Sequence, residues 1–129
     1  MNKLLIAFLL STLLLACSAS DNSAINQVSP IESAGLQSND FAVIIDVRTK
    51  NEWNNQRVSG AVHIPLAELK SRINELKSYD DKELIMMCAV GGRSSKAVEI
   101  LQQAGFNNVS NMNGGIVAWK KAKLSVEQY

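Results

Sequence analysis

The chain has 129 residues, of which 47% are hydrophobic, and its 13 basic residues nearly balance 12 acidic ones to give a net charge of +1. A balanced charge without a basic stripe argues against nucleic acid as a partner. Once the apolar N-terminal segment is set aside, about 105 residues remain, which is enough for one compact domain around a single core.

Residues 1–16 are typical of a secretory signal peptide, because Lys3 precedes an apolar run over residues 4–15 that is too short to span a bilayer. Leu14-Leu15-Ala16-Cys17 resembles a bacterial lipobox, in which the cysteine is acylated after cleavage. This resemblance predicts a periplasmic protein that is held on the outer membrane by lipid at Cys17. Ser18 agrees with this location, because a residue other than Asp after the lipobox cysteine resembles a signal for the outer membrane. An ordinary cleaved signal, with Cys17 incidental, is the alternative.

Residues 17–24 are small and polar and predict a flexible tether, so residues 25–129 are expected to form the folded domain. Ser29-Pro30-Ile31-Glu32 predicts a helix beginning near Pro30, because a cap residue precedes proline at the first helical position and glutamate follows at the third. The apolar run over residues 42–45 ends at Asp46 and is typical of a strand buried on both faces of a parallel sheet.

An amphipathic helix is predicted next, since Leu66, Leu69, Ile73 and Leu76 recur at helical spacing in a Lys- and Glu-rich segment. Residues 84–87 predict another buried strand. The helix expected after it ends at Gly105. Its predicted core face is Val98, Ile100, Leu101 and Ala104.

Residues 109–112 predict a short strand, and residues 116–121 predict a final short helix. Strands that alternate with helices predict an α/β domain whose central, mostly parallel sheet has helices on both faces. Ligands of such sheets bind beyond the carboxyl ends of the strands, which is where Asp46 and Cys88 are expected to lie side by side.

The six residues Cys88-Ala89-Val90-Gly91-Gly92-Arg93 lie between an expected strand and a helix expected from Ser94. A cysteine at the head of such a loop faces unpaired backbone N–H groups and the positive end of the helix dipole, and both favour a thiolate. Glycines let successive N–H groups converge on one point. The pattern predicts a nucleophilic Cys88, whereas the plainer interpretation is a small hydrophobic residue that ends a core strand.

This loop resembles the active-site loop of the rhodanese family, whose pattern Cys-x-x-Gly-x-Arg-Ser is matched by Cys88, Gly91, Arg93 and Ser94. Other segments are similar to the family's remaining motifs: Asp46-Val47-Arg48, Glu52-Trp53, Gly60-Ala61-Val62-His63-Ile64-Pro65-Leu66, Gly105-Phe106 and Gly114-Gly115-Ile116-Val117-Ala118-Trp119. The match covers residues 25 to 125. Gln56-Arg57-Val58 and His63 depart from the usual residues, at positions that are expected to be structural and where a change would affect only the rim of the site.

The resemblance implies a sulfurtransferase that needs no metal or organic cofactor. Cys88 would take a sulfur atom from a small anionic donor such as thiosulfate, and a thiol or cyanide would accept it. The substrate would be bound by Ala89, Val90, Gly91, Gly92, Arg93 and Ser94. Related phosphatases have a Cys-x5-Arg loop, one residue longer than this one, and no Asp near Cys88 can serve as an acid, so phosphoryl transfer is disfavoured.

Arg93 has two candidate roles, to contact the substrate or to fix the loop through a salt bridge with Asp46 or Glu52. The second role is favoured because an unpaired arginine is costly to bury. Arg48 is expected to pair elsewhere, so Asp46, Arg48 and Glu52 are predicted to be structural supports. The uncharged Ala89 and Val90 argue against thiosulfate as the physiological donor, because thiosulfate-preferring relatives often carry a basic residue there.

His63, the only histidine, is not expected to be catalytic because an activated thiolate needs no general base. A single histidine without a pair of free cysteines also argues against a zinc site. Trp53 and Trp119 are predicted to anchor the core. We expect a monomer. The competing hypothesis is a rhodanese module that carries a persulfide or binds a partner with little turnover of small molecules.

Overall fold

The computed structural model of the chain describes residues 24–129. The predicted signal peptide, Cys17 and all but the last residue of the predicted tether lie outside the described residues. None of the helices between residues 24 and 129 combines the length and the apolar content needed to cross a bilayer.

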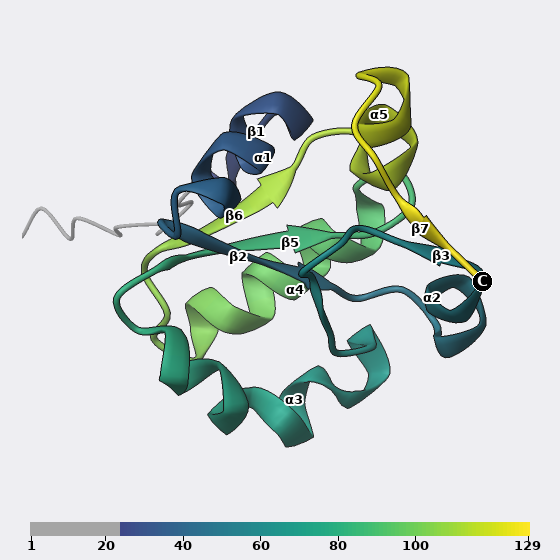
Figure 1. Cartoon of the computed structure of the whole chain (residues 1–129). Helices are drawn as coiled ribbons and strands as arrows, with labels where there is room; N and C mark the ends of the chain where they lie inside the picture. The colour runs from purple at the N-terminus through teal and green to yellow at the C-terminus, as the bar shows by residue number, and fades with distance from the viewer. Residues whose placement is uncertain (1–23) are drawn as a thin grey trace, which may run out of the picture.

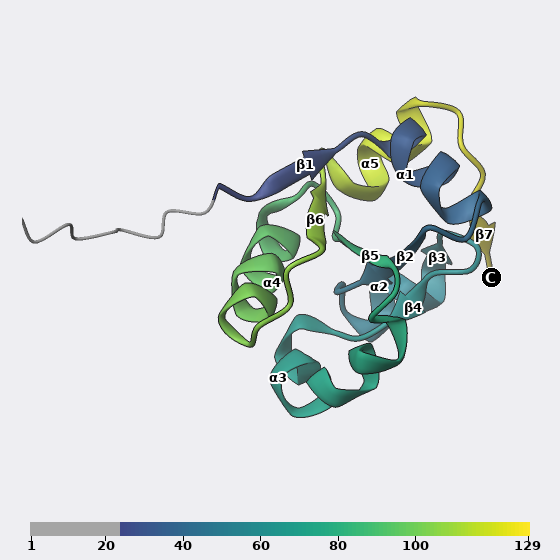
Figure 2. The same ribbon diagram turned by 90° about the vertical axis from the view of Figure 1, so that its left-hand side faces the viewer.

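A five-stranded parallel sheet forms the centre of the domain, in the order β1-β6-β5-β2-β4. Its strands are β1 (Asn26–Val28), β2 (Ala42–Asp46), β4 (Val62–His63), β5 (Glu83–Met87) and β6 (Val109–Met112). Helices α1 (Pro30–Ser38) and α5 (Gly115–Lys121) cover one face, and α3 (Leu69–Arg72) and α4 (Gly92–Gln103) cover the other (Figures 1 and 2). The predicted α/β class with helices on both faces is confirmed.

The sheet separates two apolar cores, because neighbouring residues of a strand point to opposite faces. In β2, Ile44 packs with Trp119 of α5 on one face, and Ile45 packs with Leu101 of α4 on the other. All four side chains are at most 4% exposed. The apolar runs that end β2 and β5 are therefore covered on both sides, and their last residues are held rigidly at the carboxyl edge.

The predicted start of the first helix is confirmed, since the hydroxyl of Ser29 accepts a hydrogen bond from the Glu32 amide at 3.1 Å. The core face predicted for α4 is wrong at Ala104. The helix ends at Gln103, so Ala104 becomes an exposed cap, and Ala97 packs in the core.

The single amphipathic helix predicted over residues 66–76 is replaced by three short pieces: η1 (Leu66–Glu68), α3 and η2 (Ile73–Tyr79). Both η segments are 3₁₀ helices. The hydroxyls of Ser71 and Ser78 donate to carbonyl oxygens three residues earlier, a local bonding pattern that competes with a regular α-helix. The predicted apolar stripe still packs, because Leu69 and Leu76 are fully buried.

A second, antiparallel sheet was not predicted. It joins β3 (Gln56–Arg57), which follows α2 (Lys50–Asn55), to β7 (Glu127–Gln128). The guanidinium of Arg57 lies over the rings of Trp53 and Tyr129, at 4.8 and 4.1 Å from the ring centroids. The C-terminal residues are thus held next to the C-terminal end of α2 by strand pairing and by the contacts of Arg57.

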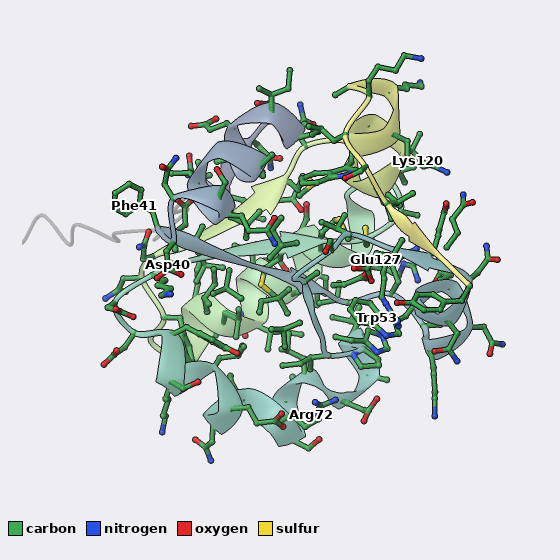
Figure 3. All side chains as sticks on the ribbon, viewed as in Figure 1. Asp40, Phe41, Trp53, Arg72, Lys120 and Glu127 are labelled. Atoms are coloured by element: carbon green, nitrogen blue, oxygen red, sulfur yellow. The ribbon has the colours of Figure 1, made fainter. Side chains whose placement is uncertain are left out.

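Trp119 is a core anchor as predicted, but the same prediction is wrong for Trp53. The Trp53 side chain is only half-buried at the edge of the domain (Figure 3). Its ring stacks on the His63 ring with a centroid separation of 4.7 Å and an interplanar angle of 6°. The Trp53 ring therefore packs against His63 and Arg57 and belongs to neither apolar core.

Candidate active site around Cys88

Cys88 directly follows β5 at the carboxyl edge of the sheet. Asp46, the last residue of β2, is paired with Met87, so Asp46 and Cys88 lie at the same edge as the sequence predicts. The Cys88 side chain is only 1% exposed. Its sulfur accepts hydrogen bonds from the Gly91 amide at 3.1 Å and from the Ser94 hydroxyl at 3.3 Å.

Two opposing effects set the protonation of Cys88. Burial raises the pKa of the thiol, whereas hydrogen bonds from the Ser94 hydroxyl and from the amides of Ser94, Gly91 and Val90 lower it. The donors outweigh burial, so the pKa of Cys88 lies below its ordinary value. A cysteine that only filled core space would keep a raised pKa, and the convergence of these donors indicates a sulfur built to carry negative charge.

Helix α5 gives the loop its shape. The Ile116 amide donates to the carbonyl oxygen of Cys88 at 2.9 Å, and the Val117 amide donates to that of Ala89 at 3.1 Å. In a trans peptide the carbonyl and the following N–H point in opposite directions. Drawing the Ala89 carbonyl toward α5 therefore turns the Val90 amide toward the sulfur.

Two glycines make this arrangement possible. Gly91, the N-cap of α4, has a φ of +117°, which side chains other than hydrogen rarely tolerate. Gly115 has a φ of +58°, and a Cβ there would overlap with the carbonyl oxygens of Cys88 and Ala89. The backbone of α5 can approach the loop only because residue 115 lacks a side chain.

Arg93 is paired with Glu52 and not with Asp46. Its two terminal nitrogens donate to the two carboxylate oxygens of Glu52 at 2.7 and 2.8 Å, which ties the start of α4 to α2. Hydrogen bonding to Arg93 lowers the pKa of Glu52 to about 2. Hydrogen bonding to Glu52 raises the pKa of Arg93, and Cys88 adds a smaller rise.

Helix α2 is itself fixed by a buried ion pair. Arg48 bonds Asp46 with Nε and a terminal nitrogen, the shortest contact being 2.7 Å, and both side chains are at most 3% exposed. The same guanidinium donates to the carbonyl oxygens of Glu52 at 3.5 Å and Gln56 at 2.7 Å. The three predicted supports therefore form one network that runs from β2 through α2 to Arg93.

The remaining loop residues predicted to bind substrate are placed differently from one another. Ser94 is buried against the sulfur, Ala89 is half-buried, and Val90 and Gly92 are exposed at the rim. His63 does not join the sulfur's hydrogen bonds, because its Nε2 contacts the carbonyl oxygen of Arg48 at 2.8 Å. Between residues 24 and 129, no group of three or more His, Cys, Asp or Glu side chains is arranged to hold a metal ion.

Sequence reasoning missed the amides of Ile116 and Val117 as part of the site. Almost every residue type carries a backbone N–H, so the identity of a residue does not show that its amide belongs to a site. The available signal was the pair Gly114-Gly115 in front of an expected helix, which marks a close approach of backbone segments.

Comparison with known proteins points to one family. The family model for the rhodanese-like domain matches residues 29–122. The thiosulfate sulfurtransferase PspE of Escherichia coli is 36% identical over 70 residues, which cover 54% of this chain and 67% of PspE. A sulfurtransferase of Allochromatium vinosum is 29% identical over 94 residues, which cover 73% of this chain and 86% of that protein. The putative sulfur carrier protein YrkF of Bacillus subtilis is 36% identical over 84 residues, which cover 65% of this chain.

The solved structures with a similar fold also include a sulfurtransferase. The crystal structure of thiosulfate sulfurtransferase from Pseudomonas aeruginosa superposes with a TM-score of 0.74 at 28% identity, over 81% of this chain and 20% of that chain. Several curated relatives extend beyond the matched region, since this chain spans 44% of the length of YrkF and 60% of that of the Bacillus subtilis protein YqhL.

We expect Gly115→Ala to destabilise the domain by about 3 kcal/mol, because the new Cβ forces α5 away from the loop carbonyls at a strained φ. The matched control is Gly35→Ala in α1, where a Cβ meets nothing within 4 Å and should stabilise the helix by about 0.5–1 kcal/mol. Urea unfolding of both variants measures the difference. Equal stabilities would contradict the close approach.

We expect Glu52→Gln to cost about 1 kcal/mol near neutral pH, because the ion pair with Arg93 is about one-third exposed and partly screened. Since folding lowers the pKa of Glu52 from 4.5 to about 2, the carboxylate's contribution is complete above pH 4.5 and disappears as pH falls toward 2. Urea unfolding at several pH values should show wild type and variant converging in acid. Glu99→Gln, in an exposed pair with Lys96, serves as the control, and a gap that is independent of pH would refute the assignment.

Proposed function

Because this chain belongs to the family of rhodanese-like domains, we propose that it is a sulfurtransferase that works through a persulfide on Cys88. The donor is a small anionic sulfur compound such as thiosulfate, and the acceptor is a thiol or cyanide. The observation that carries the proposal is the set of hydrogen-bond donors on the Cys88 sulfur, which lower the pKa of its thiol.

The reaction has two displacements. The Cys88 thiolate attacks the outer sulfur of thiosulfate, a new S–S bond forms, the bond within thiosulfate breaks, and sulfite leaves with the electron pair. The acceptor then attacks the outer sulfur of the persulfide, and the Cys88 thiolate leaves. Negative charge stays on sulfur throughout, so preorganised donors around Cys88 stabilise each state without moving.

Arg93 acts on this charge from a fixed position. Its bidentate pairing with Glu52 supports a loop-fixing role, and its positive charge at the start of α4 would favour an anionic sulfur. Ala89 and Val90 add no charge at the rim. We therefore regard thiosulfate as an assay donor and assign the physiological donor only to the class of small anionic sulfur compounds.

A persulfide carrier is the alternative function. Two observations favour it: the relative YrkF is named a putative sulfur carrier protein, and the Cys88 side chain is 1% exposed, which would protect a bound sulfur from water. A carrier would load sulfur from a donor but pass it to small acceptors slowly.

We expect Cys88 of the wild-type protein to gain the mass of one sulfur atom on treatment with thiosulfate, and Cys88→Ser to gain none, since a hydroxyl is not ionised at neutral pH. Steady-state turnover of thiosulfate with cyanide should fall by at least about 10³-fold in Cys88→Ser. Loading without turnover would identify the carrier. Absence of any mass gain on the wild-type protein would rule out both forms of the proposal.

We further propose that the protein is a monomer in the periplasm, attached to the outer membrane by lipid on Cys17. The lipobox-like sequence ending at Cys17 supports the attachment. With Cys17 acylated, Cys88 would have no cysteine partner in the chain, so no internal disulfide could form in that oxidising compartment and no resolving cysteine could rescue an oxidised Cys88. Cys17→Ser should move the protein from the membrane fraction to the soluble fraction of a Gram-negative host, and unchanged partition would count against lipidation.

A further inference from the structure

An exposed apolar patch lies at the rim of the sulfur loop, the segment from Cys88 to Arg93. Val90 is 66% exposed and Val117 is 38% exposed. The Val117 amide donates to the Ala89 carbonyl at 3.1 Å, and Val90 directly follows Ala89, so the two valines are neighbours. Apolar side chains that gather at one place on a surface mark an interaction site more often than scattered ones do.

Helix α5 extends this patch with positive charge. Val117, Lys120 and Lys121 are exposed and are spaced by three and four residues, so they share one face of the helix, while the opposite face packs in the core. Figure 3 shows Lys120 on the outer side of α5, at the end of the molecule where the parallel strands finish. The α5 rim is the name used below for four residues: Val90, Val117, Lys120 and Lys121.

The surroundings do not neutralise the positive charge of the α5 rim. Residues 100–126 include three lysines, the third being Lys123, and no Asp or Glu. None of these lysines forms an ion pair within the described part of the chain, and the carboxylates that flank the stretch, Glu99 and Glu127, are each paired with another basic residue. Even when Glu32 in the first turn of the adjacent α1 is counted against them, the three lysines leave a net positive charge.

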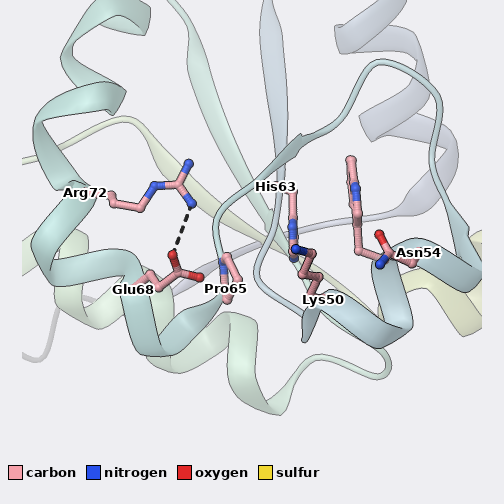
Figure 4. Close-up of a pocket in the computed structure, with 7 residues that line it drawn as sticks. Lys50, Asn54, His63, Pro65, Glu68 and Arg72 are labelled. Carbon is pink, nitrogen blue, oxygen red and sulfur yellow. Dashed lines mark ion pairs between the residues drawn. The ribbon is translucent and has the colours of Figure 1, made fainter.

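The α2 side of the sulfur loop is different. There Arg93 is paired with Glu52, which ties the loop to α2. The cavity between α2 and the η1–α3 segment has no residue of the sulfur loop in its wall (Figure 4). A partner positioned over Cys88 would therefore find its apolar and unpaired basic contacts on the α5 side.

The spacing of the α5 rim sets a lower limit on the size of its ligand. About one helical turn, roughly 5.4 Å, separates Val117 from the two lysines, so a molecule that covers both is larger than thiosulfate. The lysines would attract a small anion, but it would leave the valines uncovered. Cys88 is only 1% exposed, so the group that reaches a persulfide there must be narrow. An acidic protein surface, with an apolar residue beside a cysteine, matches the charge, the patch and the narrow access.

We propose that the α5 rim is the docking surface for an acidic partner protein that takes sulfur from Cys88, an inference that rests on the persulfide reaction proposed above. The two valines cover an apolar residue of the partner, and Lys120 and Lys121 pair with its carboxylates. A cysteine thiolate of the partner bonds to the outer sulfur of the Cys88 persulfide, the original S–S bond breaks, its electron pair returns to Cys88, and the partner leaves as a persulfide.

Short peptides with blocked ends serve as probes of the partner. Three of them end in Leu-Cys and differ only in the two preceding residues, which are both Glu, both Gln or both Lys, and a fourth is the Glu peptide with Ser in place of Leu. Discharge of the Cys88 persulfide, followed by mass as the loss of one sulfur atom, should be fastest with the Glu-Leu peptide at low ionic strength. Added salt should reduce its advantage over the Lys peptide. Equal rates with the Glu, Gln and Lys peptides would overturn the proposal.

Paired substitutions locate the docking surface. Lys120→Gln combined with Lys121→Gln should lower the ratio of the Glu-peptide rate to the Lys-peptide rate about three- to tenfold. The matched control is Lys70→Gln combined with Lys77→Gln, which removes two exposed lysines on the other face of the sheet and should leave the ratio unchanged. Val117→Ser should reduce the advantage of Leu over Ser in the peptide about two- to fivefold. If thiosulfate loading slows as much as discharge by the Glu peptide, or if the control has the same effect, the docking surface is wrong.

A binding measurement separates docking from the reaction. A fluorescent Glu-Leu peptide with Ser in place of Cys cannot accept sulfur, and its anisotropy should report binding that is several-fold weaker to the Lys120→Gln, Lys121→Gln variant than to wild type. Persulfide formation without this difference in binding would refute the docking surface. The same difference without any persulfide would place the failure in the proposed reaction.

Discussion

The site depends on two backbone hydrogen bonds, from the amides of Ile116 and Val117 to the carbonyls of Cys88 and Ala89. Left alone, a loop at a strand end would orient its peptide groups toward water. The first turn of α5 binds both carbonyls, and the Val90 amide, at the opposite end of the peptide group whose carbonyl belongs to Ala89, faces the sulfur. A protein interior tolerates few unpaired polar groups. Here the pairing of the Ala89 carbonyl with α5 directs the Val90 amide toward the sulfur.

The far end of the loop is held by a different means. Arg93 is clamped by Glu52 on α2, and α2 is held in turn by Arg48 and its buried partner Asp46. Hydrogen bonds from α5 thus fix the start of the loop and ion pairs fix its end. Both supports come from segments that follow strands at the carboxyl edge of the sheet, α2 after β2 and α5 after β6.

The apolar runs of β2 and β5, the capped start of α1 and the position of the sulfur loop could be predicted because each has a strong local pattern. β1 could not, since Asn26-Gln27-Val28 has no apolar run and exists through pairing with β6. Trp53 was misassigned because helical spacing does not distinguish a core position from a stack on His63. The partner of Arg93 was left open between two carboxylates, and only the spatial pairing of Asp46 with Arg48 decides between them.

Parallel strands also give the domain a direction. Asn26, the first residue of β1, lies at the edge of the sheet where the parallel strands begin. Cys88 lies beyond the carboxyl end of β5, at the opposite edge (Figure 1). The first described residues and Cys88 therefore lie at opposite ends of the sheet. A protein attached to a surface at Asn26 would have its reactive edge at the end of the sheet away from the point of attachment.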